Sequence, residues 1–412
     1  MKQAMARPVA PMSHTALVGL WLFSCSLLGY PLFGLLTALA NTSSWVFSIP
    51  FRLGVLTLAL TLLVMRPQGR RPLSLGEVLL WAFALIYFLR LTWDSIDQIA
   101  GAREAAVFFA VGTLAPSAAL TFSRLDLAAF EYPLAKILVA FGGLTCMLAI
   151  CMHFLKLGEA QSLTAVTGRL AYIAVNPISL GHVATTTLVA AFCLTRHRPN
   201  VVVWLGLALL CAASLLCLTL TASRGPVLAL GVCAVVYTIA TRNWKMIAGG
   251  IAAAFIVALG ALDDIGSIEQ RFTGWEYDES IQARFALQLA ALADFYQKPV
   301  LGSSFLDLTT SSYPHNIFIE SAMAMGIIGL LSAVLLVFMA LRRSLQKVNR
   351  GAMLVALLFA QYLVAAQFSG ALYGSSALWL SMLAVLAMRQ ESDAFRKQRH
   401  PSHSSVARGA ST

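Results

Sequence analysis

The chain has 412 residues, of which 59% are hydrophobic and only 11% are charged, whereas soluble domains contain about 45–50% apolar and about 25% charged residues. This composition excludes an ordinary soluble enzyme. The formal net charge of +11 would favour a nucleic-acid partner on a soluble surface, but the basic residues cluster between hydrophobic segments. We therefore interpret the charge as a sign of membrane topology and expect no nucleic-acid partner.

Apolar stretches of the length that a bilayer crossing requires, about 20 residues, recur along the whole chain. Lipid offers no partners for backbone amides, so these stretches predict an all-α, polytopic helical bundle that forms one integral membrane domain over residues 1–412. The tail 391–412 is rich in Ser, Arg and His and is expected to be disordered. In chain order, about twelve spans are predicted: 15–38, 49–65, 74–91, 104–120, 132–155, 178–195, 201–221, 226–241, 245–261, 317–341, 351–367 and 372–388.

The distribution of basic residues predicts the orientation of these spans. With a cytoplasmic N-terminus, about twenty of the 29 Lys and Arg residues fall on the inner side. This bias fits the positive-inside rule with both termini in the cytoplasm. Two outer segments are then long, 156–177 and 262–316.

The longer outer segment, 262–316, contains a candidate amphipathic helix. We expect this helix to lie along the outer membrane surface with its apolar face toward lipid and Arg284 at the rim of that face. The apolar residues that recur at helical spacing are Ile281, Phe285, Leu289, Leu292 and Phe295.

Three residues on the outer side are candidates for chemistry: Arg224, Arg284 and His315. One span begins at Gly225-Pro226 and another follows Asn316, a good N-cap, so both helices point unpaired amides outward. Two arginines and two helix N-termini suit a diphosphate. A histidine with a pKa near 6.5 can act as a general base. Together they predict transfer of a group from a lipid diphosphate to a hydroxyl acceptor.

Each of these residues also has a structural interpretation. An arginine beside a span commonly anchors the chain at lipid headgroups. A histidine ahead of a helix, such as His315, commonly belongs to a cap or turn. His153 and His182, near the outer ends of their spans, either line the same cavity or pack between helices.

A metal-assisted reaction is the chemical alternative, because paired carboxylates could hold a divalent ion against a diphosphate. The candidate acids are Asp263-Asp264 and the cluster of Glu276, Asp278 and Glu279. The first outer loop, 39–48, holds no acid, whereas metal-dependent membrane glycosyltransferases typically place an acidic pair there. We therefore expect neither a metal nor another cofactor. The seven cysteines are odd in number and form no CxxC pair, so no disulfide framework or zinc site is predicted.

Three short motifs follow one another between residues 223 and 329. They are Ser-Arg-Gly at 223–225, Pro299-Val-Leu-Gly302 after the arginine-bearing helix, and His315-Asn316 nine residues before Gly326-Ile-Ile-Gly329. This order resembles the O-antigen ligase and polymerase family. The junction Gly302-Ser303 departs from the family, whose members often have a further glycine there.

The resemblance implies a GT-C-like glycosyltransferase of the bacterial inner membrane, with about twelve spans, a large periplasmic loop and a periplasmic active site. It implies an O-antigen ligase that moves O-antigen polysaccharide from undecaprenyl diphosphate to lipid A-core, with inversion and without a metal. By position, Arg224 and Arg284 would contact the diphosphate, and His315 would activate the acceptor hydroxyl or orient the reacting groups. The partners would be the lipid-linked donor, lipid A-core and membrane lipids. Further residues are assigned by position alone: Asn316, Lys156 and Arg169 to the donor diphosphate, and Tyr313, His182 and Arg103 to the cavity lining.

Two other functions remain as alternatives. An O-antigen polymerase would use the same donor, but polymerases tend to have two large outer loops, whereas one dominates here, which favours the ligase. A secondary transporter with twelve spans belongs to another class. Transporters usually place ionisable residues near mid-membrane and show two related halves, whereas these spans are nearly free of central charges and show no internal repeat.

Overall fold

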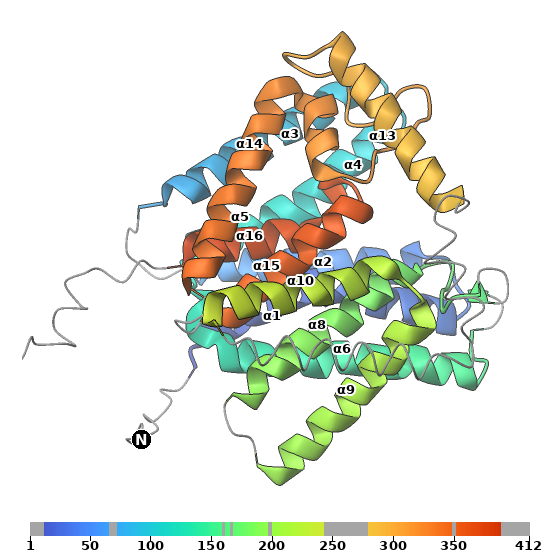
Figure 1. Cartoon of the computed structure of the whole chain (residues 1–412), viewed down its shortest axis with the longest axis vertical. Helices are drawn as coiled ribbons and strands as arrows, with labels where there is room; N and C mark the ends of the chain where they lie inside the picture. The colour runs from blue at the N-terminus through green and yellow to red at the C-terminus, as the bar shows by residue number, and fades with distance from the viewer. Residues whose placement is uncertain are drawn as a thin grey trace, which may run out of the picture.

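The computed structural model describes residues 12–65, 72–158, 161–164, 168–196, 200–242, 279–347 and 352–388. Within these ranges the chain is built from helices, most of which run side by side in one bundle (Figure 1). The short elements are the π-helical η1 (Ala110–Leu114) and the 3-10 helices η2 (Leu127–Phe130) and η7 (Leu372–Gly374). The α-helices are α1 (His14–Leu39), α2 (Trp45–Val64), α3 (Leu75–Ile96), α4 (Ala102–Phe109), α5 (Ala115–Ser123), α6 (Glu131–Phe154), α8 (Pro177–Thr195), α9 (Val201–Thr221), α10 (Arg224–Thr241), α13 (Glu279–Gln297), α14 (Ile317–Lys347), α15 (Met353–Phe368) and α16 (Ser376–Ala387).

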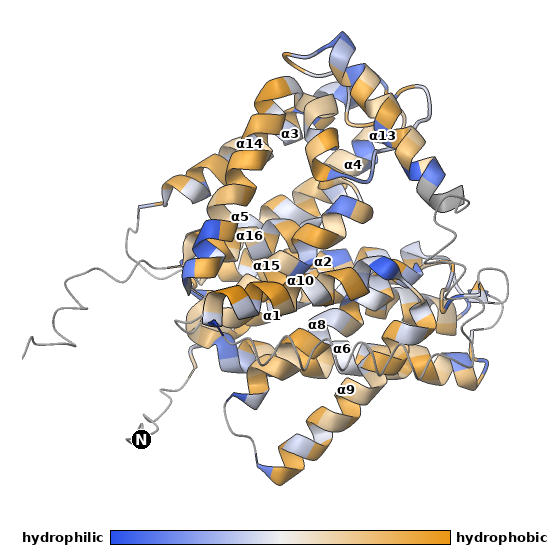
Figure 2. Ribbon diagram, viewed as in Figure 1, coloured by the Kyte–Doolittle hydropathy of each residue, from blue (hydrophilic) through white to orange (hydrophobic). Residues whose placement is uncertain are grey.

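The described helices confirm an all-α polytopic membrane protein. Nine helical segments in these ranges are long and apolar enough to cross a membrane, and α15 and α16 are shorter apolar helices. Hydrophobic residues cover the lengths of the helices, and hydrophilic residues gather at helix ends and on α13 (Figure 2). The predicted stretch 245–261, the acids between 263 and 278, and the tail 391–412 lie outside the described residues.

Side-chain caps fix where several spans begin. Ser74 and Glu77 form a reciprocal capping box at the start of α3. The side chains of Asn176 and Asn200 accept hydrogen bonds from backbone amides at the starts of α8 and α9. Such caps satisfy amides that a helix leaves unpaired in its first turn.

Contacts between helix ends gather the loops at one end of the bundle, which we call the site end. The side chain of Gln161 donates to the carbonyl of Thr42, just after α1, at 2.8 Å. The amide of Leu170 donates to the carbonyl of Leu220, in the last turn of α9, at 2.8 Å. The starts of α8 and α10, which follow these segments, therefore lie at the same end.

Helix α14 is broken at Gly326, and the segment 299–303 is seated in the break. Gly326 has φ 65° and ψ −157°, which is not a helical conformation. The amide of Ser303 donates to the carbonyl of Met323, and the amide of Ile327 donates to the carbonyl of Pro299, both at 2.8 Å. The loop thus takes up backbone groups that the broken helix cannot pair internally.

The close approach of these two segments explains why both carry glycine. Gly302 has φ 75°, and a Cβ there would overlap the backbone of Ala324. A Cβ on Gly326 would overlap the backbone of Val300. The Pro299 to Gly302 motif and the glycine motif at 326–329 are therefore two halves of one packed unit, and Ser303 fits beside it without a further glycine.

Helix α13 packs against α14 through a face other than its apolar stripe. Ala291 is fully buried, whereas Phe285, Leu289 and Tyr296 are 62%, 51% and 77% exposed. Leu292 and Phe295, which the sequence placed on one face with Phe285 and Leu289, are half-buried. The predicted apolar face is therefore split, and its exposed part has the character of a helix that contacts a membrane surface.

Candidate functional site

His315 lies at the end of the loop that leads into α14. The side-chain oxygen of Asn316 accepts hydrogen bonds from the amides of Phe318 and Ile319 at 3.0 and 3.2 Å, which fixes the start of the helix. His315 itself has a left-handed backbone with φ 55°. Its half-buried ring packs on the ring of Tyr313, with centroids 4.6 Å apart. Among the described residues, its buried Nδ1 has no hydrogen-bond partner.

The charge of Arg284 reaches the imidazole of His315. Burial, and then the positive charge of Arg284, lower the pKa of His315 below its ordinary value of 6.5. The imidazole is therefore neutral at neutral pH and can accept a proton. The pKa of the Tyr313 phenol is raised, first by burial and then by the charge of Glu320, so this hydroxyl keeps its proton.

Arg224 begins α10 in a turn that Arg169 holds in place. The guanidinium of Arg169 donates from Nε to the carbonyl of Thr221 at 3.1 Å and from Nη2 to the hydroxyl of Ser223 at 2.7 Å. Arg224 is half-buried at the site end. Two donors of Arg169, a predicted diphosphate ligand, are thus used to position the turn that carries Arg224.

The first turns of α10 pack directly on α8. The hydroxyl of Thr185 donates to the carbonyl of Pro226 at 3.1 Å, and a Cβ on Gly181 would overlap the ring of Pro226. This contact places the Arg224 turn beside the part of α8 that contains His182. Arg224 therefore lies on the α8 side of the site end, and the Arg284 and His315 pair lies on the α14 side.

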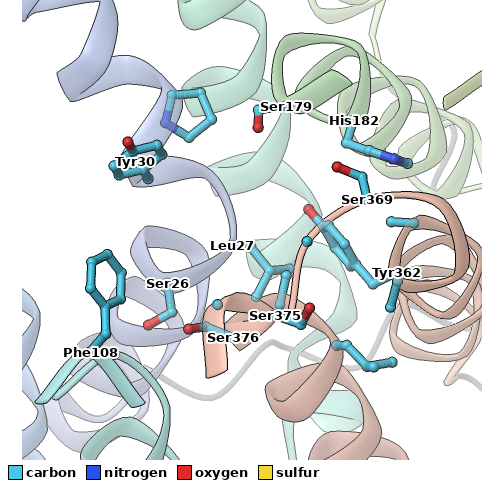
Figure 3. A pocket seen from close by; sticks show the side chains of 18 of the residues that line it. Ser26, Leu27, Tyr30, Phe108, Ser179, His182, Tyr362, Ser369, Ser375 and Ser376 are labelled. Atoms are coloured by element: carbon cyan, nitrogen blue, oxygen red, sulfur yellow. The ribbon is translucent and has the colours of Figure 1, made fainter. Parts of the chain in front are cut away.

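A cavity of about 470 Å³ lies beside these two sides, and Arg224, Arg284 and His315 are not among its lining residues. Its walls come from α1, α2, α4, η1, α8, α15, α16 and the segment between α15 and α16 (Figure 3). His182 and Tyr313 are among the lining residues. Because Tyr313 also packs on His315, a molecule in the cavity would lie one side chain away from the imidazole.

Helix irregularities are concentrated around this cavity. Pro31 interrupts the hydrogen-bonding pattern inside α1, and the π-helical turns of η1 include the lining residues Val111 and Gly112. Proline removes one helical hydrogen bond, and π segments occur frequently at functional sites. The lining therefore includes backbone that is not regular α-helix.

The remaining predicted site residues lie outside the cavity lining or use their side chains in hydrogen bonds to nearby backbone. Lys156 is exposed, with a left-handed backbone of φ 54° just after α6. Arg103 is exposed in the first turn of α4. Neither is among the lining residues of the cavity. Asn316 uses its side-chain oxygen as the cap of α14.

Residues 207–334 match a protein-family model described as O-Antigen ligase. Over this stretch the chain is similar to the O-antigen ligase family. No curated protein matches the chain. The matched stretch contains Arg224, Arg284 and His315, and this similarity indicates a function of the O-antigen ligase and polymerase type.

The O-antigen ligase stretch supplies only part of the site. Most walls of the cavity belong to α1, α2, α8, α15 and α16, which lie outside residues 207–334. The motif residues are thus combined with a cavity whose lining is encoded mainly by the rest of the chain.

Two buried acids hold together the helices and loops around this site, and the sequence analysis did not single them out. The fully buried carboxylate of Glu320 accepts a hydrogen bond from the hydroxyl of Tyr87 at 2.8 Å and from the amide of Leu372 at 2.9 Å. Asp94 pairs with Arg90 at 3.0 Å and accepts from the amide of Phe305 at 2.8 Å. An acid inside a predicted apolar span, 317–341, is the sequence signal that could have identified Glu320.

The described residues contain no group of three or more His, Cys, Asp or Glu side chains that could hold a metal ion. Asp294 and Asp307 form a close acidic pair, and the pKa of Asp294 is raised by burial and then by the Asp307 carboxyl. All seven cysteines are free.

Proposed function

We propose that this protein is an O-antigen ligase that transfers O-antigen polysaccharide from undecaprenyl diphosphate to a hydroxyl of lipid A-core. The observation that supports this most directly is the position of His315, whose ring packs on the cavity-lining Tyr313 and lies close enough to Arg284 to feel its charge. A base next to a permanent cation suits a displacement in which an alcohol loses a proton while an anionic leaving group departs.

In this reaction His315 takes the proton of the acceptor hydroxyl. The acceptor oxygen forms a bond to the anomeric carbon of the donor sugar as the bond from that carbon to the diphosphate oxygen breaks. The electron pair leaves with undecaprenyl diphosphate, whose charge Arg284 and Arg224 stabilise. Attack from the side opposite the leaving group gives inversion at the anomeric carbon and requires no metal.

The proposed location is the bacterial inner membrane, with both termini in the cytoplasm and the site end at the periplasmic face. The excess of basic residues on the opposite side supports this orientation. The membrane lipids would surround the exposed apolar surfaces of the spans and contact the stripe on α13.

The direct test uses purified full-length protein in nanodiscs with lipid-linked glycan and lipid A-core. Wild type should form the conjugate, and His315→Ala should lose about 10²–10⁴ in rate if the histidine is a general base. Arg224→Ala and Arg284→Ala should also lose most activity, whereas the exposed Arg103→Ala serves as a matched control. No conjugate from wild type, or full activity in all three variants with normal folding, would refute the proposal.

Two further measurements separate the alternatives. EDTA should leave the rate unchanged, whereas inhibition that added magnesium reverses would support the metal-dependent mechanism. Deleting the gene should abolish smooth lipopolysaccharide while lipid-linked long chains accumulate. Lipopolysaccharide capped with a single repeat would instead identify a polymerase.

A further inference from the structure

The cavity contains a cation that no motif identified, Arg52 of α2. Its guanidinium carbon lies 3.5 Å from the centroid of the Phe108 ring, on α4. Arg52 is the only permanently charged side chain among the described lining residues. No acidic side chain of the described chain pairs with it. A guanidinium has five N–H donors and no acceptor, so stacking on a ring leaves these donors available to an anion.

The polar part of the lining is suited to a carbohydrate. Phenol rings offer flat apolar faces with a polar edge, and serine hydroxyls both donate and accept hydrogen bonds. Figure 3 shows how the serines are distributed around the cavity between Phe108 and His182. The lining tyrosines and serines are Tyr30, Tyr313, Tyr362, Tyr373, Ser26, Ser179, Ser369, Ser375 and Ser376.

His182 supplies a second unused polar group on the other side of the cavity (Figure 3). Its side chain is only 7% exposed, and neither ring nitrogen has a hydrogen-bond partner among the described residues. The neighbouring hydroxyls of Thr186 and Tyr362 bond to each other at 2.9 Å, and Gln361 donates to Thr186 at 2.8 Å. The ring nitrogens of His182, and the side-chain oxygen of Gln361, have no partner among the described residues and remain available to a ligand.

We infer that this cavity binds an anionic sugar, whose phosphate or carboxylate pairs with Arg52 while its hydroxyls contact the serines, tyrosines and His182. The inference rests on the proposed function, because it adds a substrate-binding residue to the same site. A volume of about 470 Å³ lies within the usual range of ligand pockets. The anionic group comes either from the acceptor oligosaccharide or from the lipid-linked donor.

A binding experiment tests the site without relying on catalysis. Full-length protein in nanodiscs is titrated with a hexose phosphate, with the unmodified hexose and with inorganic phosphate, and binding is followed by saturation-transfer NMR. Wild type should bind the hexose phosphate most tightly. Arg52→Gln should weaken that binding about 10- to 100-fold, as the loss of a charge-assisted hydrogen bond predicts. His182→Leu should weaken the hexose and the hexose phosphate alike.

Controls distinguish lost recognition from lost structure. Arg103→Gln removes an exposed cation outside the lining and should bind as wild type does. The thermal midpoint of Arg52→Gln should match that of wild type, and Arg52→Lys should restore part of the binding. The inference is wrong if wild type does not prefer the hexose phosphate to the hexose, or if Arg52→Gln binds it as tightly as wild type.

The ligation assay then identifies the source of the anion. A loss in Arg52→Gln that disappears when the acceptor core is enzymatically dephosphorylated assigns Arg52 to the acceptor. An equal loss with both acceptors, together with a raised KM for the donor, assigns it to the donor. Unchanged ligation with every substrate would contradict a role for Arg52 in the reaction. Failure of wild type to ligate at all would refute the proposed function but leave the binding result intact.

Discussion

At the scale of single residues, the protonation of His315 should set the acid limit of activity. Burial and the charge of Arg284 lower its pKa below 6.5, so the neutral, proton-accepting form persists to lower pH than in a free histidine. In wild type, kcat/KM should therefore remain high at pH 6.5 and fall only below it. The measurement is the pH profile of kcat/KM for ligation between pH 4.5 and 8.

Replacing Arg284 separates its electrostatic effect from its binding effect. Arg284→Gln removes a positive charge, so protonation of His315 becomes easier and its pKa rises. The acid limb of the pH profile, where kcat/KM falls, should therefore move to higher pH. Arg284→Lys keeps the charge and should leave the limb near its wild-type position, even if the rate falls. A limb that stays in place in Arg284→Gln would mean that His315 is not the titrating group.

Glu320 should be a stability residue whose partners can be tested separately. Glu320→Ala leaves the hydroxyl of Tyr87 and the amide of Leu372 buried without an acceptor. Each unsatisfied group costs about 1–3 kcal/mol, so we expect a loss of about 2–5 kcal/mol in the free energy of unfolding. Adding Tyr87→Phe removes one orphaned donor and should recover part of the loss. Thermal and chemical unfolding in detergent measures the stability of the single and double variants. If the losses caused by Glu320→Ala and Tyr87→Phe simply add in the double variant, the pairing of Glu320 with Tyr87 is contradicted.

At the scale of elements, the break in α14 should depend on glycine at position 326. The angles of Gly326 belong to a region that is essentially restricted to glycine, and a Cβ would overlap the backbone of Val300. Gly326→Ala should therefore lower the free energy of unfolding by at least about 2–4 kcal/mol and displace the segment 299–303. Unfolding of the purified protein in detergent measures the first effect.

Gly231 provides the matched control. It lies inside α10, and a Cβ there would meet no atom within 4 Å. Because alanine favours helix and restricts the unfolded chain, Gly231→Ala should be neutral or stabilise by up to about 1 kcal/mol. Equal destabilisation by both substitutions would argue against the specific contact at Gly326.

The exposed stripe on α13 should contact the membrane. Phe285, Leu289 and Tyr296 have large exposed areas, while the opposite contact with α14 is made around Ala291. A bimane label at Leu289→Cys, in a variant without the native cysteines, should be strongly quenched by brominated lipids. A label at Ala283→Cys, which is exposed on another face of the helix, should be quenched less. Equal quenching at both positions would contradict this orientation.

The sequence predicted the features that local residues determine and missed those that tertiary contacts determine. The spans were predictable because a helix in lipid must satisfy its own backbone, so a long apolar stretch largely determines a helix. The break at Gly326 and the π-helical turns of η1 were not, because they depend on tertiary contacts with segments distant in the sequence. The hydropathy pattern alone does not predict those contacts.

The same distinction applies to the site. Arg224, Arg284 and His315 were predicted as site residues because polar residues next to spans are few. Arg52 has the same sequence signature as a headgroup anchor, and only the packing of α2 against α5 and η1 brings its guanidinium over Phe108 at the cavity. Arg169 matched a phosphate ligand by type, and two of its donors are directed to Thr221 and Ser223. Residue type thus indicated the chemistry, and tertiary contacts determined which groups remain available for it.

At the scale of the whole molecule, the family motifs and the cavity have separate origins in the chain. The matched stretch 207–334 supplies the motif residues, whereas α1, α2, α8, α15 and α16 supply most of the cavity walls. Substitutions among the lining residues should therefore alter which sugars are accepted, and substitutions of His315 should lower the rate with every sugar. Rates of the Arg52 and His315 variants with a panel of acceptors would distinguish the two effects.

The orientation of the molecule in the membrane gives the last prediction. If basic residues hold their loops in the cytoplasm, the loop that precedes α14 is periplasmic and the end of α14 is cytoplasmic. Ser311 and Gln346 are both exposed, one on each side. In a variant without native cysteines, Ser311→Cys should react with a membrane-impermeant maleimide in spheroplasts. Gln346→Cys should react only after permeabilisation. The reverse pattern would place Arg284 and His315 in the cytoplasm, where a periplasmic transfer to lipid A-core could not occur.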